Sequence, residues 1–149
     1  MSDYCNTVLA GASKSVTDRL QRVLNAAARL ISDTRKYDRG LTNLLHRELH
    51  WLDVPERIQY KLGTTAEQGT VLFGRRVYTG RYVASRQHLR AASRHQLVVP
   101  RHRCTTLGRR AFSVAGPMAW NALPDDVRDP ALGCNTFQRV LRTFLFSKY

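Results

Sequence analysis

The feature that most constrains this chain is an apolar pattern with helical spacing between residues 16 and 31. Apolar side chains recur there at intervals of three and four residues, which places them on one face of an α-helix. Just before the pattern, Ser15 and Asp18 match a capping box, in which both side chains satisfy free amides at a helix start. We therefore expect a helix that begins at Ser15 and buries one stripe, made of Val16, Leu20, Val23, Leu24, Ala27, Leu30 and Ile31.

Two further helices are expected to follow closely. After a polar break from Tyr37 to Gly40, leucines at helical spacing begin at Leu41 and end near Trp51. Asp53 then stands where a cap would, and Pro55 falls in the first turn, where its missing N–H is harmless. Three helices with short connections predict a small bundle. Its expected core consists of Leu20, Val23, Leu24, Leu44, Leu45, Ile58 and Leu62.

From Gly63 onward the helical signal weakens, because glycines recur through a polar stretch with short β-leaning fragments. Gln96 to Val99 is an extended run stopped by Pro100, which predicts an edge strand or an extended arm. The Gly116-Pro117 pair is expected to break residues 111–123 into two short helices. A closing helix is predicted by Asn135 to Gln138, a capping pattern, and by an apolar face at Phe137, Val140, Leu141, Phe144 and Leu145.

Together these patterns predict a mainly α protein with three parts. Residues 1–67 would form the three-helix bundle, residues 68–104 an irregular basic middle segment, and residues 105–149 a C-terminal module of short helices. Trp51 and Trp120 stand beside leucines at helical spacing, so we expect both to anchor the core rather than to stack on a ligand.

The charge of the chain points to a polyanionic partner. Lysine and arginine number 24 against 11 acidic residues, a formal net charge of +13. The stretch from Gln68 to Pro124 holds ten arginines interleaved with aromatic residues, and neither a lysine nor an acidic residue. Such a mixture suits contact with phosphates and stacking on bases, although a solvated basic face would look similar.

Seven arginines are the candidate nucleic-acid contacts. Three of them fall within an arc of about 80° on the first helix, beside its apolar stripe, at 100° per residue. The other four come from the basic middle segment and the start of the C-terminal module. The set is Arg19, Arg22, Arg29, Arg101, Arg103, Arg109 and Arg110.

Several separate blocks of the chain, in a consistent order, carry a family likeness. They are Asp3 to Asn6, Arg19 to Val23, Asn25 to Leu30, Leu49 to Leu52, Val54, Arg57 with Ile58, Leu97 to Arg101, Gly108, Arg110 to Pro117, Trp120 to Asp126, and Phe137 to Phe146. In these blocks the chain resembles the thumb and C-terminal tail of jockey-like (LINE) non-LTR retrotransposon reverse transcriptases. Residues 63–82 depart from the family pattern, and we interpret them as a deletion or a frameshifted patch.

The resemblance implies a piece of an RNA-directed DNA polymerase that lies downstream of the catalytic palm. Residues 1–67 would then be thumb-like, and a thumb holds a template–primer duplex through its backbone. The expected partner is an RNA or DNA duplex, bound without sequence preference, and the missing polymerase core is a second candidate. In the alternative hypothesis the chain is an interaction module whose Trp120 to Asp126 tail docks on that core without binding nucleic acid. A broad apolar patch near Phe137 to Leu145 would favour that alternative.

The residues offer no constellation for chemistry, so we expect no catalytic residues, no metal, no cofactor and no small-molecule substrate. Polymerases need aspartates that hold two Mg²⁺ ions. Asp125-Asp126 is the only candidate pair, but it follows Pro124, which suits a solvated turn better than a hairpin strand. His46 with His50, and His102 with Cys104, lack the further ligands of a zinc site and are interpreted as structural or surface residues.

Cysteine usage and the lack of apolar segments bear on the compartment. Cys5, Cys104 and Cys134 are odd in number and widely spaced, which suits a reducing environment. No basic region precedes an apolar run at the start of the chain, and no run of about 18 apolar residues occurs. We expect an intracellular protein, nuclear or cytoplasmic, that is neither secreted nor bound to a membrane.

Overall fold

The computed structural model describes residues 6–72, 95–102, 107–129 and 131–149, and this part of the chain is mainly helical, as predicted. Arg103 and the stretch 73–94 of the predicted basic segment lie outside the described residues. In chain order the elements are a 3-10 helix η1 (Asn6–Leu9), α1 (Lys14–Ser32), α2 (Leu41–Asn43), a π-helical turn η2 (Leu44–Glu48), α3 (Val54–Leu72), α4 (Leu107–Arg110), α5 (Phe112–Asn121) and α6 (Cys134–Phe146).

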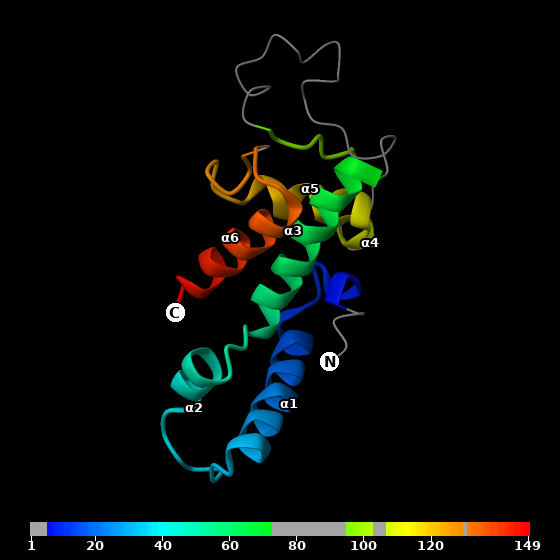
Figure 1. The fold of residues 1–149 in the computed structure, drawn as a ribbon. Helices are drawn as coiled ribbons and strands as arrows, with labels where there is room; N and C mark the ends of the chain where they lie inside the picture. The colour runs from blue at the N-terminus through cyan, green and yellow to red at the C-terminus, as the bar shows by residue number, and fades with distance from the viewer. Residues whose placement is uncertain (1–5, 73–94, 103–106, 130) are drawn as a thin grey trace.

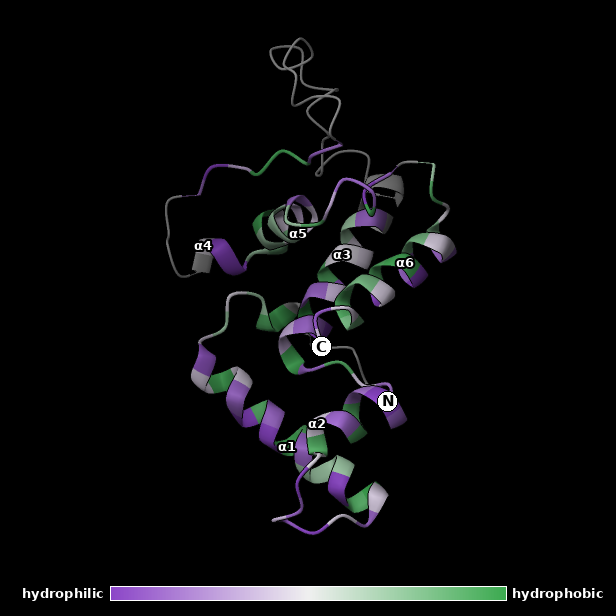
Figure 2. Cartoon of the chain, turned by 90° about the vertical axis from the view of Figure 1, so that its left-hand side faces the viewer, coloured by the Kyte–Doolittle hydropathy of each residue, from purple (hydrophilic) through white to green (hydrophobic). Residues whose placement is uncertain are grey.

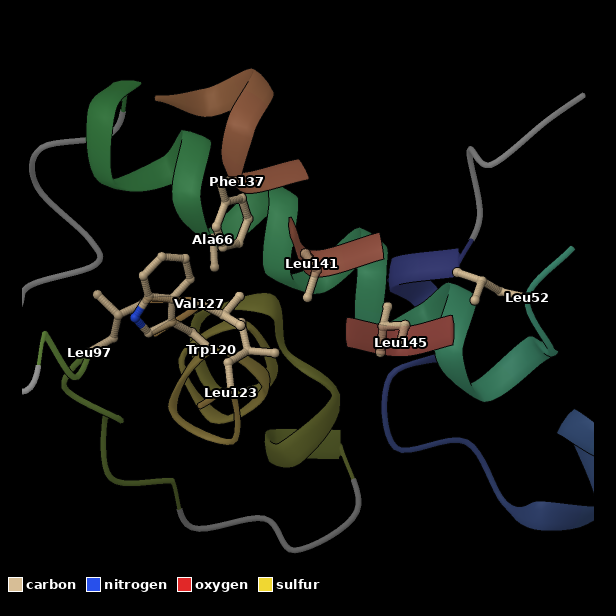
Figure 3. Close-up of a cluster of buried hydrophobic side chains, with 9 residues drawn as sticks. All are labelled: Leu52, Ala66, Leu97, Trp120, Leu123, Val127, Phe137, Leu141 and Leu145. Carbon is tan, nitrogen blue, oxygen red and sulfur yellow. The ribbon is translucent and has the colours of Figure 1, made fainter. Parts of the chain in front are cut away.

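Helix α3 is the centre of the molecule. It runs up the middle, with α5 and α6 beside its upper part and α1 and α2 near its lower end (Figure 1). The largest buried cluster joins α3 to the two C-terminal helices and to the segment around Leu97 (Figure 3). Its members are Leu52, Ala66, Leu97, Trp120, Leu123, Val127, Phe137, Leu141 and Leu145.

A second cluster covers another side of α3. Val54, Ile58 and Leu62 of that helix pack against Ala10 and against Ala115 of α5. Both clusters therefore draw on residues from the first 67 positions and from the last 45. The proposed parts 1–67 and 105–149 share their core, since the apolar face of α3 is covered mainly by α5 and α6.

The stripe of α1 is not buried as expected. Leu20 and Val23, predicted as core residues, are 36% and 67% exposed, so this part of the prediction is wrong. Leu24 packs at the edge of the second cluster, and Ala28 is fully buried. The predicted core residues Leu45, Ile58 and Leu62 are buried. The physical reason is length, because α2 and η2 together contain only eight residues. These are too few to pack along the 19 residues of α1.

A polar joint connects α1 to the start of α3. The Gln21 amide nitrogen donates to Asp53 Oδ1 at 2.7 Å, and its oxygen accepts from the Val54 N–H at 2.9 Å. The Val54 N–H is one of the amides that the start of α3 leaves without a helical partner. Gln21 therefore satisfies the α3 N-terminus from a neighbouring helix, while Asp53 precedes α3 as predicted.

The start of α1 differs from the prediction by one residue. The helix begins at Lys14, with Ser13 at the cap position, and the Ser15 hydroxyl bonds to that of Ser13. Asp18 does not reach back to the Ser15 amide. Its carboxylate accepts two bonds from Lys14 Nζ, at 2.9 and 3.0 Å, so a pairing one turn apart replaces the capping box.

Two helices extend further than the sequence patterns predict. Helix α3 runs past Gly63 to Leu72, and Gly63 lets α6 approach, since a Cβ there would lie 3.0 Å from Leu141 Cδ2. Helix α5 passes through Pro117 instead of splitting in two. Gly116 has no Cβ to clash with the Pro117 ring, and the carbonyl left without a donor belongs to the exposed Ser113, where water can reach it.

The residues around Leu97 are extended, as predicted. The Asn121 side chain holds them, because its oxygen accepts from the Leu97 N–H at 2.8 Å and its nitrogen donates to the Leu97 carbonyl at 2.9 Å. Next to it, Trp120 Nε1 donates to the His95 carbonyl at 2.9 Å. Trp120 is buried, which confirms it as a core anchor, whereas Trp51 is half-buried with the Arg57 guanidinium over its ring.

Candidate nucleic-acid interface

The candidate interface begins with the arginines of α1. Arg19 and Arg22 are exposed, and Arg29 is half-buried near the C-terminal end of the helix. Arg22 Nε donates to the backbone oxygen of Asp18 at 3.4 Å, a bond that leaves its charge uncompensated. Asp18, the only acidic residue in α1, is engaged by Lys14. This surface of the helix is therefore a row of cations whose charge no carboxylate neutralises.

A second pair of cations comes from the far end of the sequence. Arg109 and Arg110 form the last turn of α4, and both are exposed. Arg110 reaches back to the Val8 carbonyl at 3.5 Å. A Cβ at Gly11, whose φ of +65° favours glycine, would lie 3.3 Å from Arg110 Cγ. Arg110 thus lies against the turn that leads into α1, so residues about 100 positions apart meet at one end of that helix.

The remaining predicted contacts are less informative. Arg101 is exposed in the segment that follows Leu97, and Arg103 lies outside the described residues. Ion pairs between side chains in the described ranges join Lys14 to Asp18, His46 to Asp53 and Arg128 to Asp125. None of these pairs involves a described arginine of the candidate set, so the formal positive charge stays available to solvent.

The Asp125-Asp126 pair lies in a turn, as expected. Both residues are exposed in the turn that follows Pro124, and the carboxylate of Asp125 accepts a bond from the Arg128 guanidinium. Within the described ranges, no group of three or more histidine, cysteine or acidic side chains is arranged to hold a metal ion. Cys134 is exposed at the first residue of α6, and Cys5 and Cys104 lie outside the described residues.

Sequence reasoning missed a buried polar cluster around His46. The imidazole lies in η2, and its Nδ1 atom is 2.8 Å from the Trp51 carbonyl. Its ring stacks on that of Tyr149, with centroids 3.5 Å apart. The Tyr149 hydroxyl accepts a bond from the Asp53 N–H at 3.1 Å. Burial, followed by the nearby Asp53 and Glu56 carboxylates, raises the pKa of Tyr149 above its ordinary value. No sequence signal linked position 149 to position 46.

Comparison of the chain with protein-family models, with curated proteins and with solved structures finds no match in any of the three. Among the helices of the described residues, none combines the length and the apolar character that crossing a lipid bilayer requires.

Proposed function

We propose that this protein binds the backbone of an RNA or DNA duplex without reading its sequence, as a non-catalytic piece that resembles the thumb and tail of a non-LTR retrotransposon reverse transcriptase. The protein would be intracellular, and its possible further partner is a polymerase core. Polymerase activity is not expected, because the only acidic pair suited to metal binding lies in an exposed turn.

One observation carries the proposal. The α1 arginines are exposed or half-buried without a carboxylate partner, and the α4 arginines lie at the N-terminal end of the same helix. Duplex phosphates are spaced regularly and attract such unpaired guanidinium groups, which release counterions when they bind. Because phosphate contacts are independent of base identity, binding of this kind would be non-specific.

The proposal is tested by the salt dependence of duplex binding. The Arg19→Ala, Arg22→Ala, Arg29→Ala triple variant should bind a fluorescent duplex more weakly than the parent chain. Its slope of log K against log salt should shrink by up to about 2.7, since each lost phosphate contact removes about 0.9. Fluorescence anisotropy at several salt concentrations measures both quantities, on duplexes of two unrelated sequences.

A matched control separates location from total charge. Arg39, Arg47 and Arg139 are exposed, and they lie apart from one another, in the loop before α2, in η2 and in α6. Their triple alanine variant loses the same formal charge and should keep most of the parent slope. If the α1 variant and the control lose the same affinity, α1 is not the binding surface. An Arg109→Ala, Arg110→Ala variant should weaken binding in the same direction, with a slope change of up to about 1.8.

Fewer observations support the alternative hypothesis, in which the chain docks on a polymerase core without binding nucleic acid. Of the patch at Phe137 to Leu145 that would favour it, Phe137, Leu141 and Leu145 lie inside the chain's own core, whereas Val140 and Phe144 are half-buried and line an open hollow on α6. Trp120 and Leu123 of the tail are buried in the core. Exposed apolar side chains of the kind that a docking protein needs are also found on α1.

A further inference from the structure

Helix α1 exposes an apolar row that the other described residues leave uncovered. We call it the α1 stripe. Leu30 is 86% exposed, Val23 67% and Ile31 61%. The C-terminal end of α1 lies far from α5 and α6 (Figures 1 and 2). A row of 16 residues rises about 22 Å at 1.5 Å per residue, the length of four helical turns. The stripe consists of Val16, Leu20, Val23, Leu30 and Ile31.

The stripe is distinct from the face by which α1 packs. At 100° per residue, Leu24, Ala28 and Gln21 lie about 80°, 120° and 140° from Val16 on one side. These three residues face the second cluster, the interior and the Asp53 joint respectively. The stripe residues lie within about 60° of Val16, next to that packed face but turned away from it. One side of α1 therefore packs against the rest of the protein, while the adjacent side exposes apolar surface to which a partner could bind.

The spacing of the stripe matches a helical partner. With the half-buried Ala27 between Val23 and Leu30, its residues recur at intervals of three and four. Such spacing makes a seam into which the side chains of a second helix can fit. Helix α1 contains no aromatic residue, whereas helices that lie in a membrane surface commonly use tryptophan or phenylalanine on the apolar face. This composition favours a protein helix over a lipid surface.

Charge selects the kind of helix. Arg19 borders the stripe about 60° from Val16, on the side away from the packed face. It is exposed, and Arg22 lies about 60° further round. A second copy of α1 could not neutralise these cations, since its only carboxylate, that of Asp18, already accepts two bonds from Lys14. Two chains that each carry +13 also repel one another.

We propose that the α1 stripe binds an amphipathic partner helix that has an apolar seam and acidic residues along the edge facing Arg19. Desolvation of Val23, Leu30 and Ile31 supplies the affinity, and the carboxylates opposite Arg19 set the orientation and reject basic helices. The inference goes beyond duplex binding and does not rest on it, because Arg22 and Arg29 lie further from the stripe than Arg19 does.

The test uses the full chain and a designed helical peptide of about 20 residues with a leucine seam and glutamates on both edges. A matched peptide carries lysine at every glutamate position. Fluorescence anisotropy should show binding of the glutamate peptide and binding at least about tenfold weaker for the lysine peptide. The Val23→Gln, Leu30→Gln variant should lose at least about tenfold in affinity, because it removes two apolar anchors. Arg19→Gln should lose a smaller factor.

Both substituted apolar residues are exposed, so the variant should fold, and its helical circular dichroism should equal that of the parent. Its duplex affinity should be unchanged, and an Arg22→Ala, Arg29→Ala variant should keep peptide affinity within about twofold. These two controls separate failure of this inference from failure of duplex binding.

Several results would overturn the proposal. Equal binding of the two peptides, or unchanged affinity of the Val23→Gln, Leu30→Gln variant, would remove the roles of charge and stripe. Vesicles of phosphatidylcholine and phosphatidylserine that bind the parent but not this variant, with no peptide binding, would identify a lipid surface instead. A concentration-dependent dimer in sedimentation velocity that disappears in the same variant would identify a second copy.

Discussion

Helix α3 is packed in different ways by the C-terminal helices and by α1. Helices α5 and α6 bury large side chains against it completely, and the cluster in Figure 3 brings together residues from five segments of the chain. Near the N-terminal end of α3, α1 is attached by one glutamine, one fully buried alanine and one partly buried leucine, while most of its apolar residues face solvent. Similar amphipathic patterns therefore have different structural roles. The apolar face of α6 completes a core, whereas most of the apolar face of α1 stays exposed.

The largest expected effect separates these two regions by stability. Leu141→Ala removes a fully buried side chain from α6 and should lower the free energy of unfolding by about 2–5 kcal/mol. Val23→Ala on α1 removes an exposed side chain and should change it by less than about 0.5 kcal/mol. Urea denaturation followed by circular dichroism measures both variants. Equal losses would mean that the α1 stripe is covered in solution.

A smaller effect is expected at the joint that connects the two regions. Gln21→Ala removes the acceptor of the Val54 N–H and the donor to Asp53 Oδ1, and it should cost about 1–3 kcal/mol. Gln138→Ala serves as the control, since its amide makes only an exposed contact with Cys134 Sγ, and it should cost less than about 0.5 kcal/mol. If both variants unfold at the parent urea concentration, Gln21 does not hold α1 in place.

The smallest expected effect concerns the C-terminal residue. Tyr149→Phe removes the oxygen that accepts the Asp53 N–H and should cost about 0.5–1.5 kcal/mol at neutral pH. Tyr37→Phe, at an exposed tyrosine without a hydrogen bond in the described structure, should cost nothing measurable. The same denaturation experiment compares the two, and a loss confined to Tyr37→Phe would contradict the role given to Tyr149.

The raised pKa of Tyr149 predicts how the stability of the protein depends on pH. Because burial raises the pKa of its hydroxyl in the folded state, the unfolded chain releases this proton at lower pH than the folded chain does. Deprotonation of the tyrosine therefore stabilises the unfolded state relative to the folded state as pH rises above the ordinary tyrosine pKa of about 10. Parent stability should fall in that range, and Tyr149→Phe should remove this part of the fall. A steeper fall in the variant would contradict the assignment.

Helices were predictable from the sequence where an apolar period is long, but their partners were not. Residues 16–31 and 137–145 both show such a period, and both are helical. An apolar period predicts which face of a helix is apolar but not what packs on that face, which is why Leu141 is buried and Val23 is exposed. Contacts between distant residues, such as Asn121 with Leu97, depend on the assembled fold and carry no local signal.

The candidate interface was predictable to a similar extent. Spacing alone placed the α1 arginines on one arc, and the structure describes two of them as exposed and the third as half-buried. That Arg110 would lie against the turn before α1 could not be read from the sequence, because it depends on how α5 packs on α3. The continuous helix through Pro117 was not predicted for another reason. A Gly-Pro pair usually breaks a helix, but here Gly116 and the exposed residue Ser113 allow the helix to continue through the proline.

The shared core of α3 has a consequence for biosynthesis. The residues of α5 and α6 that pack against α3 leave the ribosome after it. Leu145 lies 73 positions beyond Leu72, the last residue of α3. At about 5–20 residues per second, translation of that stretch takes roughly 4–15 s. During this interval, the face of the nascent α3 that packs on α5 and α6 is not yet buried by them. A chaperone that binds such surfaces would have that window in which to act.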